Sequence, residues 1–181
     1  MPTVTVLRDD RGLVAAAVIR GKTLLATSIG CDEEKTMADA IKRSGGGAHL
    51  ALDDFGLKVC SELLKAARGK PMKFGYRLNF TRMSPLARKI LRLVQRIPRG
   101  EVVDYAGLAR RAGTHPRAVG RILSLNPYPL IVPCHRVVMA NGRLGGYSLG
   151  AQLKARILEA EGIKIDGKLQ RIKRNGPQRR G

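Results

Sequence analysis

The stretch DYAGLARRAGTHPRAVGRILS, residues 104–124, decides how the second half of this chain folds. Asp104 is a candidate cap for a short helix that runs to about Ala112, and Gly113 ends that helix. Pro116 then opens a second short helix, because proline is favoured in a first helical turn. Two short helices joined by a glycine-containing turn predict a helix-turn-helix, in which the second helix is the recognition helix.

The recognition helix separates polar from apolar side chains. Three polar residues share one face at i, i+4 and i+7: Arg117, Arg121 and Ser124. Val119, Ile122 and Leu123 face back toward a core. Two guanidinium groups therefore lie on the exposed face, which favours a contact with DNA. An ordinary helical hairpin with solvated arginines is the alternative.

A further helix precedes this pair. Ser84 and Pro85 provide a cap and a first-turn proline. Apolar residues then recur at helical spacing: Leu86, Ile90, Leu93, Val94 and Ile97. The sequence Pro98-Arg99-Gly100 ends the helix.

The segment NPYPLIVPCHRVV, residues 126–138, follows the recognition helix. Its three prolines exclude a helix, so we expect an extended crossing that buries Leu130–Val132 and holds Cys134 on a stiff segment. A free thiol has a pKa near about 8.5, and His135 and Arg136 as neighbouring cations would raise the thiolate fraction. A buried, unreactive cysteine is the alternative.

The first 80 residues predict a small α/β module. Three apolar runs bounded by turns are expected to form a meander of strands: Thr3–Leu7, Leu13–Ile19 and Thr23–Ser28. Two helices and an extended segment are expected after them: Asp32–Arg43, Leu57–Arg68 and Phe74–Phe80. The pairs Asp9-Asp10 and Asp53-Asp54 are interpreted as turn residues rather than metal ligands.

The charge of the chain is concentrated in its second half. The 181 residues carry 34 basic and 14 acidic side chains, a net charge of +20. Residues 1–80 have a net charge of +4, and residues 81–181 a net charge of +16. This asymmetry predicts a polyanionic partner such as nucleic acid, with a basic surface kept for solubility as the alternative.

No apolar run approaches the roughly 20 residues of a membrane span, and the N-terminus is unlike a signal peptide. With 44% hydrophobic residues the chain can bury a core. We therefore expect a soluble, cytoplasmic protein associated with the nucleoid and not with a membrane.

Cys31, Cys60 and Cys134 form no ligand array with histidine, so we predict no metal. Whether Cys31 pairs with Cys60 is left open by the sequence.

Five motifs stand in order between Phe80 and Gly162: GEVVDY at 100–105, RAVG at 117–120, NP at 126–127, PCHRV at 133–137 and GYS at 146–148. Together they resemble the O6-alkylguanine-DNA alkyltransferases. The few Asn and Gln residues favour a thermophilic source, and the resemblance implies an archaeal one. The N-terminal half resembles the ribonuclease-H-like module of these proteins only in its size and layout.

The resemblance implies an α/β, ribonuclease-H-like N-terminal module over residues 1–78. It implies a mostly α, winged helix-turn-helix domain for DNA binding and alkyl transfer over residues 79–165. Residues 166–181 remain as a basic tail that contacts DNA nonspecifically.

The resemblance also implies direct-reversal repair without a cofactor. An alkyl group would move irreversibly from guanine O6, and less well from thymine O4, to Cys134, once for each molecule. His135, linked through a water to Glu161, would take the thiol proton. Tyr105 would donate a proton to the purine N3.

Further roles follow from the same resemblance. Ser148, with Tyr147, would contact the O6 side of the base. The carbonyls of Cys134 and Val137 would accept hydrogen bonds from its amine. Asn126 would brace the turn before the cysteine segment. A monomer would bind duplex DNA in the minor groove. Arg117 would be the finger that enters the base stack, and the small residues Ala118 and Gly120 would let the helix approach the DNA closely. Arg121 and Ser124 would also contact the DNA.

Leu149 departs from the Gly-Gly that many family members have after the serine. Because leucine narrows a pocket, we expect a methyl group to be accepted better than a benzyl group. Three other functions are alternatives: a non-catalytic helix-turn-helix module for damage recognition, a thiol hydrolase, and a self-alkylating transcriptional activator. The presence of Cys134 argues against the first. The lack of an oxyanion site argues against the second, and the lack of a second acceptor cysteine against the third.

Overall fold

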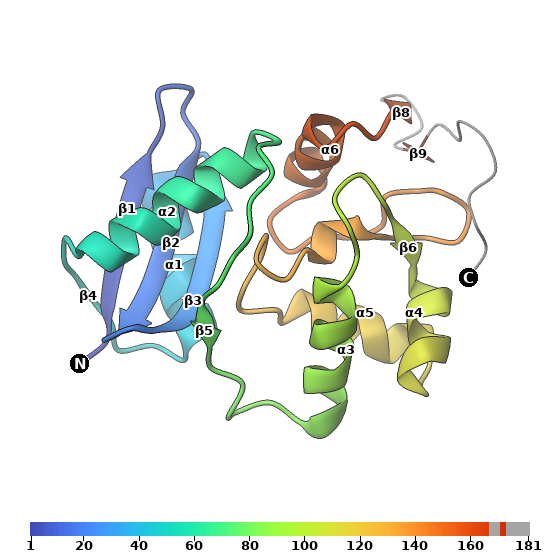
Figure 1. Cartoon of the computed structure of the whole chain (residues 1–181), viewed down its shortest axis with the longest axis horizontal. Helices are drawn as coiled ribbons and strands as arrows, with labels where there is room; N and C mark the ends of the chain where they lie inside the picture. Colours follow the sequence, from blue (N-terminus) through green and yellow to red (C-terminus); the bar gives the residue numbers. More distant parts are fainter. Residues whose placement is uncertain (167–170, 173–181) are drawn as a thin grey trace. The chain divides into compact units, whose positions relative to one another are not determined.

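The computed structural model describes residues 1–166 and 171–172 (Figure 1). Most of the predicted basic tail lies outside the described residues. Contacts divide the chain into two compact units. The N-terminal unit comprises Met1–Met83 and Asn126–Ile131, and the C-terminal unit comprises Ser84–Leu125 and the described residues from Val132 onward.

The N-terminal unit is built on a five-stranded sheet. Its strands stand in the order β4 (His49–Leu50), β1 (Thr3–Arg8), β2 (Val14–Arg20), β3 (Thr23–Gly30) and β5 (Arg77–Leu78). Strands β1, β2 and β3 pair antiparallel, which confirms the predicted meander. The two short edge strands each run parallel to their neighbour.

Two helices cover opposite faces of this sheet (Figure 1). Helix α1 (Glu33–Ser44) packs Ala40 in one cluster with Val4 and Val18. Helix α2 (Asp54–Ala67) crosses the other face. There a Cβ added at Gly56 would lie 2.3 Å from the hydroxyl of Thr5, so the close crossing requires glycine.

The helix starts follow from side-chain caps. The carboxylate of Asp32 accepts from the amide of Lys35 at 2.9 Å, and that of Asp53 accepts from the amide of Gly56 at 2.9 Å. Because Asp53 caps α2, this helix begins three residues earlier than predicted. The interpretation of Asp53-Asp54 as turn residues was therefore wrong, since Asp53 caps α2 and Asp54 is its first residue.

The C-terminal unit is mostly helical, as expected. Its elements are α3 (Pro85–Gln95), β6 (Val103–Asp104), α4 (Tyr105–Ala112), α5 (Pro116–Ser124), the 3₁₀ turn η1 (Cys134–Arg136), β7 (Val137–Val138), α6 (Ala151–Ala160), β8 (Ile165–Asp166) and β9 (Arg171–Ile172). Strand β6 pairs parallel with β7, and β8 pairs antiparallel with β9.

The predicted helix pair is confirmed as α4 and α5, which pack against each other and on α3. Asp104 caps α4 through the amide of Gly107 at 2.7 Å, and Ser84 caps α3 through the amide of Ala87 at 3.2 Å. His115, which was predicted only as a turn residue, caps α5.

Among the described residues, no helix is both long and apolar enough to cross a membrane.

Candidate active site

Cys134 opens a tight turn rather than continuing an extended segment. Leu130–Val132 are buried as predicted, but the segment before Cys134 is not extended, because it bends at residues 127–128 and turns at 130–131. The amide of Arg136 donates to the carbonyl of Pro133 at 2.9 Å, and the amide of Val137 donates to the carbonyl of Cys134. The expectation that Cys134 lies on an extended segment was therefore wrong. The turn instead holds the cysteine buried, with 4% of its surface exposed.

The β6–β7 pair brings Tyr105 into the neighbourhood of this turn. Val103 stands opposite Val137 in the ladder, and Tyr105 follows β6 directly as the first residue of α4. Burial raises the pKa of Tyr105 above its ordinary value, and the negative charge of Cys134 raises it further. Tyr105 is thus a neutral phenol within electrostatic reach of the cysteine.

The phenol of Tyr105 also contacts the glycine-rich loop before α6. Its hydroxyl donates to the carbonyl of Gly146 at 3.5 Å. A Cβ added at Gly145 would lie 3.3 Å from the tyrosine ring. Gly145 has a φ of +71°, so both its conformation and its contact favour glycine.

His135 contacts Glu161 directly. The Nε2 atom of His135 lies 3.1 Å from the Oε1 atom of Glu161, and both side chains are almost completely buried. The water that was expected between them has no place in this contact, so that detail of the prediction was wrong. The pairing of the two residues was right.

The second ring nitrogen of His135 takes no part in the contact with Glu161. Its Nδ1 atom is buried and has no hydrogen-bond partner among the described residues. Burial lowers the pKa of His135 below its ordinary value, although the hydrogen bond and charge of Glu161 oppose this shift. The imidazole is therefore neutral at neutral pH and can accept a proton.

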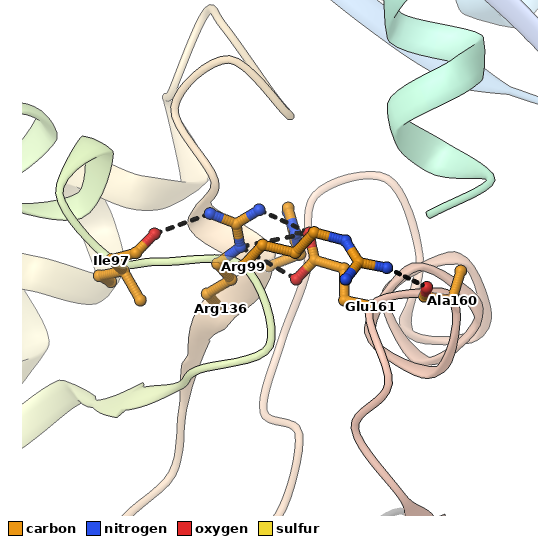
Figure 2. A network of polar contacts seen from close by, with 6 residues as sticks. Ile97, Arg99, Arg136, Ala160 and Glu161 are labelled. Atoms are coloured by element: carbon orange, nitrogen blue, oxygen red, sulfur yellow. Dashed lines mark hydrogen bonds and ion pairs between the residues drawn. The ribbon is translucent and has the colours of Figure 1, made fainter. Parts of the chain in front are cut away.

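Arg136 turns away from solvent to bind Glu161 (Figure 2). Its guanidinium donates to both carboxylate oxygens, at 3.0 Å and 2.6 Å, and to the carbonyl of Ile97 at 2.7 Å. In the same network Arg99 donates to the carbonyl of Ala160 at 2.8 Å, at the end of α6.

The carboxylate of Glu161 stays ionised in this network. Burial alone would raise its pKa, but hydrogen bonds from His135 and Arg136 and their charges lower the pKa to about 2. Glu161 therefore orients His135 as a fixed negative charge. Arg136, expected as a cation that activates the thiol, is instead committed to Glu161.

Lys154 is a buried cation that the sequence interpretation missed. Its ammonium donates to the carbonyls of Val137 at 2.7 Å, Leu144 at 2.5 Å and Gly146 at 3.5 Å. Burial lowers the pKa of Lys154 to about 8, although the negative charge of Cys134 opposes this shift. Lys154 is therefore a buried cation within electrostatic reach of Cys134.

A signal for Lys154 was present in the sequence. Residue 154 lies three positions before Ile157 and four before Leu158, on the buried face of α6. A lysine on the apolar stripe of an amphipathic helix is rare unless it is paired. That pattern could have identified Lys154 before the structure did.

The loop after Leu144 carries the remaining residues that were expected to contact the substrate. Tyr147 is half-buried, and the ammonium of Lys154 lies 6.0 Å from the centre of its ring. Ser148 is exposed and Leu149 half-buried. Val137 is buried in β7, and its carbonyl already accepts from Lys154.

Helix α5 has the polar face that its sequence predicts. Arg117, Arg121 and Ser124 are exposed, whereas Val119 and Leu123 are buried against the rest of the unit. Ala118 and Gly120 are half-buried.

Asn126 belongs to the N-terminal unit and not to the unit that holds Cys134. Its side-chain oxygen accepts from the amide of Tyr128 at 3.0 Å, which stabilises a turn at this point of the chain.

Cys31 is exposed, Cys60 is buried, and they are not joined by a disulfide. Within residues 1–166 and 171–172, no three His, Cys, Asp or Glu side chains gather as metal ligands.

The arrangement suits nucleophilic chemistry at sulfur. It combines a buried thiol with an adjacent neutral imidazole, a carboxylate that orients the imidazole, a buried ammonium and a neutral phenol. Groups of these kinds can serve as a nucleophile, a base with its orienting group, a charge that stabilises a thiolate, and an acid.

Comparisons with known proteins agree on this half of the chain. The family model described as "6-O-methylguanine DNA methyltransferase, DNA binding domain" matches residues 85–163. A methylated-DNA–protein-cysteine methyltransferase of Methanothermobacter thermautotrophicus is 44% identical over 90 residues, which cover 50% of this chain and 51% of that protein. The chain therefore matches about half the length of this relative.

Solved structures extend the likeness to nearly the whole chain. An O6-methylguanine-DNA methyltransferase of Pyrococcus kodakaraensis matches with a TM-score of 0.76 and 28% identity, covering 89% of this chain and 100% of that one. An O6-methylguanine DNA methyltransferase of Methanococcus jannaschii matches with a TM-score of 0.62 and 30% identity, covering 90% of this chain and 95% of that one.

Proposed function

The chain belongs to the O6-methylguanine-DNA methyltransferase family, and from this premise we propose that it repairs O6-alkylguanine in duplex DNA by transferring the alkyl group to Cys134. Thymine O4 would be a poorer donor. The observation that carries the proposal is the buried Cys134 next to the contact between His135 and Glu161, because it places a nucleophile beside an oriented base.

The transfer step balances without a cofactor. The sulfur of Cys134 attacks the alkyl carbon, so that a carbon–sulfur bond forms while the bond between that carbon and guanine O6 breaks. The thiol proton passes to Nδ1 of His135, directly or through a water, and Glu161 stabilises the resulting imidazolium. Tyr105 protonates the purine N3, so the guanine leaves neutral. The thioether on Cys134 is permanent, and each molecule acts once.

Lys154 stabilises the thiolate before the attack. Its ammonium is the buried cation within reach of Cys134, and its three carbonyl partners hold it in place. The same hydrogen bonds tie Val137 to the loop that carries Tyr147 and Ser148. We infer that this loop and the carbonyl of Val137 contact the base, with Ser148 on the O6 side.

DNA binding is assigned to the exposed face of α5. Arg117 would enter the base stack as the lesion leaves it, and Arg121 and Ser124 would contact the backbone. Half-buried Ala118 and Gly120 would permit a close approach in the minor groove. Since repair must work at any sequence, binding rests on phosphate contacts and weakens steeply as the salt concentration rises. The net charge of +16 over residues 81–181 favours such phosphate contacts.

Four finer assignments belong to the same proposal. The N-terminal α/β unit is ribonuclease-H-like, and the C-terminal helical unit is a winged helix-turn-helix, as the family likeness supports. The protein acts as a monomer, and it works in the cytoplasm at the nucleoid, where its substrate lies.

The test is intact-mass spectrometry after incubation with a duplex that contains O6-methylguanine. The expected result is one methyl group for each protein, mapped to Cys134. The variant Cys134→Ala should gain nothing, and the matched control Cys31→Ala, which removes an exposed thiol, should gain one methyl group like the wild type.

Two results would overturn the proposal. Tight binding to the damaged duplex without any mass change would make the chain a damage-recognition module, the second candidate. A methyl group on Cys31 rather than Cys134 would remove every role assigned to the buried site.

A further inference from the structure

Six residues between α5 and Cys134 belong to the N-terminal unit. The chain leaves the C-terminal unit after Leu125, contributes Asn126–Ile131 to the N-terminal unit, and returns at Val132. Only Val132 and Pro133 then separate this excursion from Cys134. The segment that leads from the recognition helix to the nucleophile is thus held by the other half of the protein.

Backbone carbonyls provide two of its attachments. The amide of Thr27 in β3 donates to the carbonyl of Pro127 at 2.8 Å, and the hydroxyl of the same threonine donates to the carbonyl of Pro129 at 3.2 Å. Prolines have no amide hydrogen, so a proline-rich segment is held chiefly through its carbonyls.

Tyr128 provides a third attachment. Its side chain is completely buried, and its hydroxyl accepts from the amide of Asn79 at 2.8 Å while it donates to the carbonyl of the same residue at 2.6 Å. Its ring meets the ring of Phe80 edge to face, with 5.6 Å between the centres. These contacts fix the middle of the segment.

Arg43 at the end of α1 holds the first residue of the segment. Its guanidinium donates to the carbonyl of Asn126 at 2.6 Å and to the carboxylate of Asp39 at 2.6 Å. The hydroxyl of Ser28 donates to the same carboxylate oxygen at 2.6 Å. With only 8% of its side chain exposed, Arg43 is a buried guanidinium oriented by two further residues.

Leu130 indicates that the segment is held under strain. It is the only residue other than glycine with a positive φ among those the structure describes, at +72°, and it is buried. This conformation is unfavourable for a residue with a side chain and persists only when the surroundings enforce it. The attachments around it supply that enforcement.

We propose that Arg43 is a positioning residue for the reaction: by binding the carbonyl of Asn126 it fixes the segment from which Cys134 is presented. The inference rests on the function proposed above. It gives the N-terminal unit a defined role, which is to hold the nucleophile in register with the recognition helix. No substrate contact is assigned to Arg43 itself.

The test compares Arg43→Lys with Lys42→Met in the full chain. Lysine keeps the charge but cannot hold both Asp39 and Asn126, whereas Lys42→Met removes an exposed charge from the same helix. We expect Arg43→Lys to lower the single-turnover methyl-transfer rate at saturating duplex by about tenfold or more. Its dissociation constant for undamaged duplex should stay within about twofold of the wild type.

A second readout does not depend on repair. The rate at which iodoacetamide modifies Cys134, followed by peptide mapping across a pH series, should change in Arg43→Lys and not in Lys42→Met. If the wild type transfers no methyl group, the proposed function fails, but this readout still tests the positioning role. A merely structural Arg43 would lower the melting temperature and leave both rates of the folded protein unchanged.

Two conservative variants keep the test decisive if Arg43→Lys does not fold. Thr27→Val removes the hydroxyl that binds Pro129 and keeps the amide that binds Pro127, and Tyr128→Phe removes only the hydroxyl bound to Asn79. Each should slow transfer at saturating duplex with little change in DNA affinity. The proposal is overturned if the folded variants match Lys42→Met in transfer and in iodoacetamide modification, or if their losses are entirely in DNA affinity.

Discussion

The ammonium of Lys154 donates a hydrogen bond of 2.7 Å to the carbonyl of Val137, three residues after Cys134. No part of the Lys154 side chain reaches solvent. A buried ammonium is costly unless neighbouring groups compensate its charge. Here the compensation comes from three carbonyls, and a thiolate at Cys134 would add to it, so that Lys154 and the thiolate would stabilise each other.

We therefore expect Lys154→Met to make Cys134 less acidic. Removing the cation should raise the midpoint of the pH profile for iodoacetamide modification of Cys134 by about one pH unit. Methyl transfer near neutral pH should slow accordingly. Arg156→Met is the matched control, since it removes an exposed cation from the same helix and should leave the profile unchanged.

The pKa of Lys154 also predicts how stability varies with pH. Its folded-state pKa of about 8 lies below the ordinary value of 10.5, so the unfolded chain binds the proton more tightly. This group therefore destabilises the fold below about pH 8, and the destabilisation disappears as the pH rises from about 8 to 10.5. Urea unfolding of the wild type and of Lys154→Met between pH 7 and pH 9.5 would measure the difference, and equal slopes would contradict the assignment.

Glu161 makes the opposite prediction at acidic pH. Its folded-state pKa of about 2 lies below the ordinary 4.5, so its contribution to stability is complete above pH 4.5 and is lost as the pH falls toward 2. We expect Glu161→Gln to lower the free energy of unfolding by about 3 kcal/mol at pH 7, because it leaves Arg136 buried without its counter-ion. The gap between wild type and variant should close on acidification.

Glu33→Gln is the comparison for this prediction. Glu33 pairs with Arg8 at 3.5 Å, but both side chains are about half exposed. Such a surface pair contributes about 1 kcal/mol at most. If urea unfolding gave the two variants the same stability at pH 7, the network in Figure 2 would not stabilise the fold as argued.

Local signals account for the parts of the fold that the sequence predicted. Ser84 and Asp104 each cap an amide three residues away, so these caps can be predicted without knowing what the helices pack against. The apolar run Leu13–Ile19 predicted a strand, and it forms β2, whose residues are all buried except Arg20.

Contacts between residues distant in sequence account for what was missed. Arg136 lies two residues after Cys134, and this short separation in sequence suggested that it activates the thiol. It binds Glu161, 25 residues away, because α6 ends beside the cysteine turn. The bond from Arg43 to Asn126 joins residues 83 apart, and no helical or strand period could predict it.

Leu149 predicts the substrate range of the site. It lies half-buried between Ser148 and Gly150, where many members of the family have glycine. We expect the wild type to react faster with O6-methylguanine in a duplex than with free O6-benzylguanine. Leu149→Gly should raise the ratio of the benzyl rate to the methyl rate by about tenfold, since it removes a bulky side chain next to Ser148, which is proposed to contact the O6 side of the base. Equal rates in the wild type would refute the role of Leu149.

Methylation of Cys134 should itself destabilise the protein. The cysteine is 4% exposed, and the turn that holds it is closed by backbone hydrogen bonds on both sides. An additional methyl group in a packed site costs about 1–3 kcal/mol because neighbouring side chains must shift. For a chain of this size that corresponds to a fall in melting temperature of about 5 °C.

The measurement is thermal unfolding of the protein before and after complete methylation by an O6-methylguanine duplex that is then removed. Cys134→Ala taken through the same treatment should keep its melting temperature. A methylated protein that melts at or above the temperature of the unmodified form would show that the site holds room for the product.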